Sequence, residues 1–207
     1  MVSIPRCCSV LVLVLASLIA VGPRILADAE ITLHAGGRFG GEADAGTIRV
    51  DALDAGPAFG LSYHHRLREQ GWLWGAWSAQ RTEFDTPGLL PDRASIDLDV
   101  HYLHAGTSYR PQGRGRTQGF VMFGLGLTWV DPRPSEFDTG LGGSLLIGGG
   151  FRVAIRPAVA FRLDARGYAT FTDTELKGRC GDSACSIDFA GSGPFQVDVL
   201  AGVSFAF

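Results

Sequence analysis

Residues 195–207, FQVDVLAGVSFAF, alternate apolar with small or polar side chains over their whole length. The odd positions carry the apolar set: Phe195, Val197, Val199, Ala201, Val203, Phe205 and Phe207. Among the even positions, Leu200 departs from the pattern. A period of two residues is typical of a β-strand whose two faces meet different surroundings. This stretch therefore predicts a two-faced strand.

The same alternation recurs upstream, in residues 31–39, 53–63, 96–102, 121–129 and 159–171. Two further segments are less regular, because Trp74 and Trp77 take opposite parities in 72–83 and because 141–153 is rich in glycine. The segments run near the 9 to 11 residues that a tilted strand needs to cross a bilayer. Together they predict an all-β fold, an eight-stranded antiparallel up-and-down transmembrane β-barrel.

Residues 1–29 read as a secretory signal peptide. Arg6 precedes an apolar run from Val10 to Val21, and Ala27-Asp28-Ala29 forms a small-x-small cleavage site. The run is shorter than the roughly 20 residues that a spanning helix needs. We therefore expect a signal peptide at 1–29 and a barrel domain at 30–207.

Composition excludes several classes of protein. A hydrophobic content of 46% argues against a disordered chain, and a formal net charge of −3 gives no support for nucleic-acid binding. Cys180 and Cys185 follow the signal peptide in a polar, glycine-rich stretch, which predicts a disulfide in an exported protein. Asp182 and Asp188 nearby do not complete a convincing zinc site, so we expect no metal and no cofactor.

The less apolar face of the strands is rich in Gly, Ala and Ser, and it also carries charges. The predicted lumen charge network is Arg38, Asp54, Asp97, Asp99, His101, Arg162, Asp164, Arg166 and Asp198. The interior of an eight-stranded barrel is just wide enough for side chains, and charges held there need partners. A water-exposed surface would use more lysine, whereas the chain beyond Ala29 has Lys177 alone. The apolar face is therefore expected to meet lipid.

The predicted connections alternate in length and in charge. Short turns at 64–71, 110–118 and 152–157 carry seven Arg and one Glu, and longer loops at 40–50, 84–94, 131–139 and 172–193 carry eleven acidic and five basic residues. Short turns on the periplasmic side and long loops outside are typical of outer-membrane barrels. The acidic loops are interpreted as a solvated surface, with binding of divalent cations or basic partners as the alternative. Aromatic residues near strand ends are expected at the bilayer interfaces: Tyr63, Trp72, Tyr109, Trp129 and Phe207.

The end of the chain carries a family resemblance. Val203, Phe205 and the terminal Phe207 resemble the signal that the outer-membrane barrel assembly machinery reads. With the signal peptide and the glycine-rich strands, residues 30–207 resemble the small bacterial outer-membrane β-barrel proteins of the OmpA and OmpW type. Segments 78–82, 124–126 and 164–168, with the cysteine loop, look like a glycine-rich subgroup of that family. The resemblance implies a monomer in the bacterial outer membrane. The partners that it implies are outer-membrane lipids and lipopolysaccharide, the assembly machinery and periplasmic chaperones.

Within that class we expect a structural or surface-interaction role with a packed, charge-paired lumen. A narrow channel for small or apolar solutes is one alternative. An outer-leaflet lipid A-modifying enzyme is another, because some small barrels use His and Ser with a carboxylate. The sequence places His64 and His65 in a turn, and it gives no histidine a Ser and an acid at readable spacing. His101 beside Asp97 and Asp99 is the best cluster, and we expect it to pack in the lumen. No catalytic residue is predicted.

Overall fold

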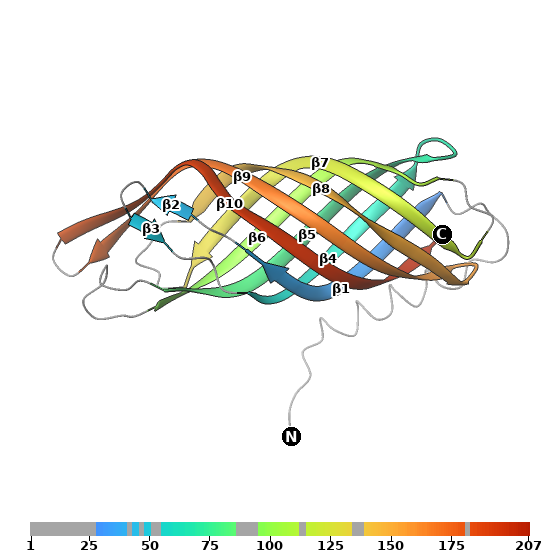
Figure 1. Cartoon of the computed structure of the whole chain (residues 1–207), viewed down its shortest axis with the longest axis horizontal. Helices are drawn as coiled ribbons and strands as arrows, with labels where there is room; N and C mark the ends of the chain where they lie inside the picture. Colours follow the sequence, from blue (N-terminus) through green and yellow to red (C-terminus); the bar gives the residue numbers. More distant parts are fainter. Residues whose placement is uncertain are drawn as a thin grey trace, which may run out of the picture.

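The computed structural model describes residues 28–40, 43–45, 48–50, 55–85, 95–111, 115–133, 139–180 and 183–207. The described chain forms one closed barrel of eight strands and a small two-stranded sheet (Figure 1). The barrel strands are β1 (Ala29–Phe39), β4 (Gly56–Arg66), β5 (Gly71–Asp85), β6 (Ser95–Tyr109), β7 (Thr117–Pro132), β8 (Gly140–Arg156), β9 (Val159–Cys180) and β10 (Ser183–Ala206). The small sheet pairs β2 (Ala43–Ala45) with β3 (Ile48–Val50). The predicted eight-stranded antiparallel barrel is confirmed.

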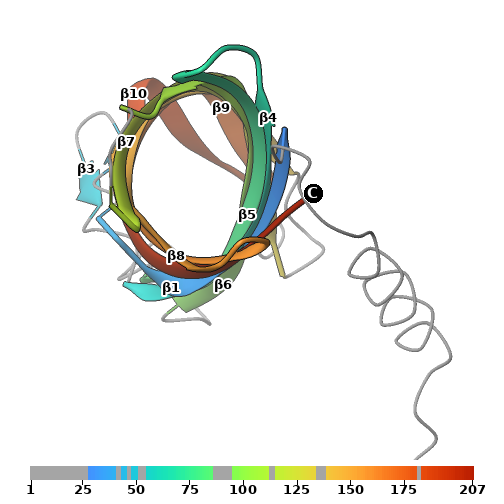
Figure 2. The ribbon, with the colours of Figure 1, turned by 90° about the vertical axis from the view of Figure 1, so that its right-hand side faces the viewer.

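The barrel closes where its first and last strands meet. β1 pairs with β10 on one side and with β4 on the other, and every neighbouring pair is antiparallel. The backbones of Ala29 and Phe207 exchange two hydrogen bonds, of 3.2 and 2.9 Å between nitrogen and oxygen. Figure 2 looks along the barrel and shows the strands as a ring. Closure pairs each barrel strand on both edges, which a bilayer requires of its backbone.

The alternation in the sequence becomes an inner and an outer face. In β10 the odd residues from Phe195 to Val203 are directed outward, and the even residues from Gln196 to Ser204 are buried inside. Leu200, which departs from the polar pattern, is one of the buried inner side chains. Large apolar side chains remain exposed around the outside, among them Leu33, Phe59, Leu103, Phe123, Ile147, Phe161 and Val199. This outer belt is suited to lipid rather than to water.

The two ends of the barrel differ. At the turn end lie Ala29, Phe207, the connections 67–70 and 157–158, and residues 110–111 and 115–116 between β6 and β7 (Figure 1). At the loop end lie β2, β3 and the hairpin of β9 and β10. The sequence predicts a loop at 172–193, but the backbone pairing of these two strands continues from Phe171 with Ser192 out to Cys180 with Ser183. Antiparallel neighbours can keep pairing beyond the bilayer, so this connection is a projecting hairpin.

Glycines on the inner face make room for large neighbours. One row across the strands runs Trp74, Gly106, Gly124 and Leu146. A Cβ on Gly124 would lie 2.6 Å from the Trp74 ring, so the indole occupies the space that this glycine leaves. A second row runs Ala76, His104, Gly126 and Ser144, and there His104 reaches past Gly126 to Ser144. The glycine-rich strands therefore allow a narrow interior to be filled.

Among the described residues, no helix is long and apolar enough to cross a membrane.

Candidate functional site

One side of the lumen is a wall of buried charges. We call it the charged wall, and its members lie on β1, β9 and β10: Glu30, Arg38, Arg162, Asp164, Arg166 and Asp198. All six are essentially inaccessible to water. Asp164 accepts two hydrogen bonds from Arg162, both of 3.2 Å, and one of 2.7 Å from Arg166. Strand alternation positions these three residues, since 162, 164 and 166 all face inward on β9.

Glu30 is the centre of the wall at the turn end. Its Oε2 accepts from Arg152 at 2.8 Å and from Arg110 at 3.3 Å, and its Oε1 accepts from Arg162 at 3.3 Å. Arg110 lies just beyond the end of β6, against the ring of Trp72 at 4.0 Å. Burial lowers the pKa of Arg110 to about 10, with Glu30 opposing that shift. The guanidinium therefore remains charged at neutral pH.

Nearer the loop end, two tyrosines and an ion pair meet inside the lumen. The guanidinium of Arg38 pairs with both oxygens of Asp198, and its Nη2 also donates to Ser78 at 2.7 Å. Tyr168 donates to Asp198 at 2.9 Å. The rings of Tyr102 and Tyr168 stack with centroids 4.4 Å apart, and Arg38 lies 4.6 Å above the Tyr102 ring. We call Arg38, Asp198, Tyr102 and Tyr168 the plug.

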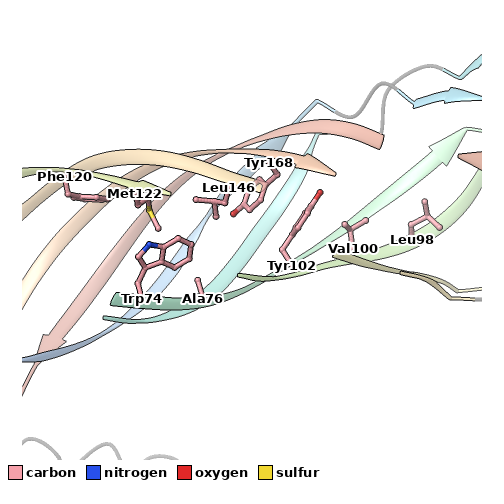
Figure 3. Close-up of a cluster of buried hydrophobic side chains, with 9 residues drawn as sticks. All are labelled: Trp74, Ala76, Leu98, Val100, Tyr102, Phe120, Met122, Leu146 and Tyr168. Atoms are coloured by element: carbon pink, nitrogen blue, oxygen red, sulfur yellow. The ribbon is translucent and has the colours of Figure 1, made fainter. Parts of the chain in front are cut away.

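The opposite side of the lumen carries a buried apolar cluster, and the same strands also bury Ser78, Gln80, Thr82, His104, Ser108, Thr128 and Ser144. We call the cluster the apolar wall, and its inward side chains come from β5 to β8 (Figure 3): Trp74, Ala76, Leu98, Val100, Phe120, Met122 and Leu146. The two tyrosines of the plug belong to the same buried cluster. Tyr102 also donates to Gln196 of β10 at 2.7 Å. The plug thus joins the apolar wall to the charged wall.

A histidine pair lies within the charged wall. Ser62 Oγ is 2.9 Å from Nε2 of His34 and 3.2 Å from Nε2 of His64, and all three residues are buried. His34 Nδ1 is 3.9 Å from Asp164, too far for a hydrogen bond. Arg166 and Arg162 lie 3.0 and 3.1 Å from the two histidine Nε2 atoms. Within the described part of the chain, Nδ1 of neither histidine has a hydrogen-bond partner.

The prediction for the start of β6 is wrong. Asp97, Asp99 and His101 face outward, whereas Leu98, Val100 and Tyr102 point into the lumen. The physical reason is that β6 pairs with β5 in unbroken register from Ser95 to Tyr109, so one parity holds along the strand. Leu103, Ala105 and Tyr109 face the outside, and the odd residues before them must do the same. Polar side chains face outward at the start of β6, whereas His104 faces inward. Residues 96–102 alone do not show this change.

Outward-facing polar groups of β6 find partners at the loop end. His101 stacks between Trp77 and Trp129, with ring centroids at 6.0 and 5.0 Å. Asp99 accepts from Arg81 at 3.2 Å and from Arg133 at 3.0 Å. Slight burial raises the pKa of Asp99, but these hydrogen bonds outweigh it and leave the pKa below its ordinary value. This cluster belongs to the outer surface, not to the lumen network.

Other predicted residues fall in different places. His64 lies in the lumen instead of a turn, because its strand β4 runs on to Arg66. Trp72 is buried beneath Arg110 instead of facing an interface. Asp54 and the side chains of Cys180 and Cys185 lie outside the described residues. Val203, Phe205 and Phe207 are directed outward, and their role in assembly stays a prediction.

Several residues of the site were missed. Glu30, Arg110, Arg152, Tyr102 and Tyr168 make central contacts, yet the sequence placed two of these arginines in turns and named none of the five in the network. The alternation of β1 could have identified Glu30 as an inward residue, because Glu30 lies on the same face as Thr32 and His34. Arg110 lies at an even position, as His104 does, but it follows the end of the strand, and its inward contacts are with Glu30 and the Trp72 ring. Among the described residues, no group of three or more His, Cys, Asp or Glu could hold a metal ion.

No protein-family model matches the sequence. No curated protein matches it either.

Solved structures show the fold. Neisserial surface protein A (NspA) is 12% identical, with a TM-score of 0.59 over 87% of this chain and 97% of its own. The outer membrane protein AlkL is 16% identical, with a TM-score of 0.59 over 91% of this chain and 94% of its own. OprG from Pseudomonas aeruginosa is 13% identical, with a TM-score of 0.53 over 87% of this chain and 97% of its own. The chain therefore has the fold of the small eight-stranded outer-membrane barrels, as its sequence resemblance predicts.

The outer surface agrees with that fold. Exposed leucines, valines and phenylalanines surround the barrel, while the charged residues of the charged wall are turned inward. A bilayer demands this inside-out arrangement of a closed sheet. Fold and outer belt together place the barrel in the bacterial outer membrane.

Proposed function

We propose that this barrel is closed to solutes and acts through its loop end, as a structural or surface-interaction protein of the outer membrane. The plug is the observation that carries the proposal. Arg38, Asp198, Tyr102 and Tyr168 cross-link β1, β6, β9 and β10 by hydrogen bonds and ring stacking. Since these bonds connect strands on different sides of the lumen, opening a path would require several of them to break together.

The filling of the lumen supports the same conclusion. Trp74, Arg162, Arg166, Leu146 and Leu200 are all fully buried there. An eight-stranded barrel encloses little more than the volume of such side chains. A route for solutes has no support from this packing.

The loop end offers the surface for interaction. The hairpin of β9 and β10 carries the pairing far beyond the 9 to 11 residues that a span requires (Figure 1). The four predicted loops, this hairpin included, have eleven acidic against five basic residues. A partner at this end would therefore present basic groups or bound cations. Outer-membrane lipids and lipopolysaccharide, the barrel assembly machinery and periplasmic chaperones are the other proposed partners.

The proposal is tested in proteoliposomes that hold the refolded chain. We expect no uptake of small sugars or of an apolar dye above protein-free vesicles, with folding checked by heat-dependent gel mobility. Reproducible uptake would overturn the closed-lumen proposal in favour of the channel. Lipid A from cells that overproduce the chain should keep its mass spectrum, and an altered acyl pattern would favour the enzyme.

A hairpin variant tests the role of the loop end. Replacing residues 174–191 with Asn-Gly should leave a barrel that still assembles and still shifts on heating, since the replaced part lies beyond the barrel wall. A shortened chain that fails to assemble would show that the hairpin serves barrel stability, and the interaction role would then be rejected for it.

A further inference from the structure

The turn end of the lumen holds an excess of positive charge. Arg110, Arg152, Arg162 and Arg166 surround Glu30 and Asp164, which leaves two positive charges uncompensated within this group. The plug is different, because Arg38 and Asp198 balance one another. Uncompensated charge is costly in a water-poor interior unless a counter-charge is present. The excess is therefore confined to one end of the lumen.

Arg110 presents a free fork of donors at that end. Its Nη1 donates to Glu30, while its Nε and Nη2 have no hydrogen-bond partner within the described part of the chain. The residue is only 5% exposed, and the Trp72 ring covers the guanidinium at 4.0 Å. The Nε and Nη2 edge is the one with which arginine binds an oxyanion through two parallel hydrogen bonds.

A hydroxyl group faces the same region. Ser108 occupies the inward position immediately before Arg110 along β6, and it is 4% exposed. Its Oγ also has no hydrogen-bond partner among the described residues. Twelve buried side-chain atoms of the described chain lack a hydrogen-bond partner, and three of them belong to these two residues, which lie two positions apart beside the excess positive charge. Because buried donors need acceptors, this grouping indicates a common ligand.

We propose that the fork of Arg110 and the hydroxyl of Ser108 bind a phosphate-class oxyanion at the turn end of the lumen. A doubly charged free phosphate matches the two uncompensated positive charges, whereas the singly charged phosphodiester of a phospholipid offsets one of them. The oxygens of either group can accept hydrogen bonds from the three donors. Arg152, whose side chain is 13% exposed, contacts Glu30 at the same end. The ligand enters from the turn end, either as free phosphate or as the headgroup of a phospholipid.

Binding is measured with the refolded full chain in a detergent that contains no phosphate. Inorganic phosphate should raise the urea midpoint of unfolding, and sodium chloride of equal ionic strength should not, because a ligand that binds the folded state stabilises it. Arg110→Lys keeps the charge but removes the fork, and it should abolish the shift. Ser108→Ala should weaken the apparent phosphate affinity about two- to tenfold, the effect of one lost hydrogen bond.

Arg116→Lys is the matched control, since Arg116 is exposed in the same connection. It should keep the full phosphate response. The site is rejected if phosphate leaves the wild-type midpoint unchanged, or if Arg110→Lys responds to phosphate as Arg116→Lys does. Ser108→Ala preserves the arginine cluster, so an unweakened response there would exclude the hydroxyl from the site even if Arg110→Lys did not fold.

A second titration separates the two sources of the anion. If the headgroup is the ligand, phosphatidylglycerol added to the detergent micelles should shift the urea midpoint as far as free phosphate does, at a lower total concentration of phosphate groups. No response to the lipid, with the response to free phosphate retained, would assign the site to the soluble anion.

Discussion

The charged wall and the apolar wall fill the same lumen by different physical means. On β1, β9 and β10, Glu30, Asp164 and Asp198 are held by arginines through directional hydrogen bonds. On β5 to β8, Trp74, Met122 and Leu146 pack against glycines and one another. Removing one partner of an ion pair leaves a buried charge without compensation. Removing an apolar side chain leaves a space that its neighbours partly fill. The two walls should therefore respond differently to substitution.

The largest effect is expected in the charged wall. Arg162→Ala removes partners from both Glu30 and Asp164, and it should lower the free energy of unfolding by about 3 to 5 kcal/mol. The measurement is urea unfolding in lipid vesicles, followed by heat-dependent gel mobility. Arg116→Ala, in an exposed connection, should stay within about 0.5 kcal/mol of wild type. Equal losses for the two variants would contradict the paired-charge account of this wall.

The apolar wall is tested by adding volume at a glycine. Gly124→Ala places a Cβ 2.6 Å from the Trp74 ring, and overpacking of this kind should cost about 1 to 3 kcal/mol. Gly143→Ala is the matched control on β8, since no atom of the described chain lies within 4 Å of its added Cβ. Combining Gly124→Ala with Trp74→Phe should recover part of the loss. If both single glycine variants behave alike, the glycine row does not control packing.

The junction between the walls should give an intermediate to small effect. Tyr102→Phe keeps the ring stack with Tyr168 but removes the hydroxyl that donates to Gln196. A buried amide oxygen then loses its donor, which should cost about 1 to 2 kcal/mol in the same unfolding assay. A cost below that of exposed Tyr63→Phe would show that this hydrogen bond does not couple the walls.

The smallest effect is expected outside the lumen, at Asp99. Asp99→Asn should cost less than about 1 kcal/mol, because Arg81 and Arg133 are largely solvated. The pKa of Asp99 is lowered in the folded state, so its contribution is present above the unfolded pKa and disappears as the pH falls through the folded one. Wild type and variant should then converge at acid pH. A difference in unfolding free energy between wild type and Asp99→Asn that grows as the pH falls would contradict the lowered pKa of Asp99.

Sequence reasoning reached the fold because a period of two residues persists through most strands. It also placed Arg38, Arg162, Asp164, Arg166 and Asp198 on a common inward face, since strand parity fixes direction. It failed in β6, where apolar residues change from the even to the odd positions between Tyr102 and Leu103. The loop-end half of that strand carries Asp97 and Asp99 outside and Leu98 and Val100 inside, which reverses the pattern of the turn-end half.

The alternation of residues along a strand does not predict which side chains meet across the lumen. The contact of Glu30 with Arg110, Arg152 and Arg162 joins residues from four places in the chain, and only the closed register brings them together. The same holds for Tyr102 and Tyr168, whose stacking depends on the diameter of the barrel. Residue spacing along one strand carries no information on these distances.

Single-channel conductance in a planar bilayer tests the closed lumen most directly. Refolded wild-type chain should be silent, and the double variant Tyr102→Ala with Tyr168→Ala, if its gel mobility still shifts on heating, should show openings because the plug has lost its stacked rings. Steady openings of the folded wild-type barrel would contradict the account. They would make the charged wall the lining of a pore instead of part of its closure.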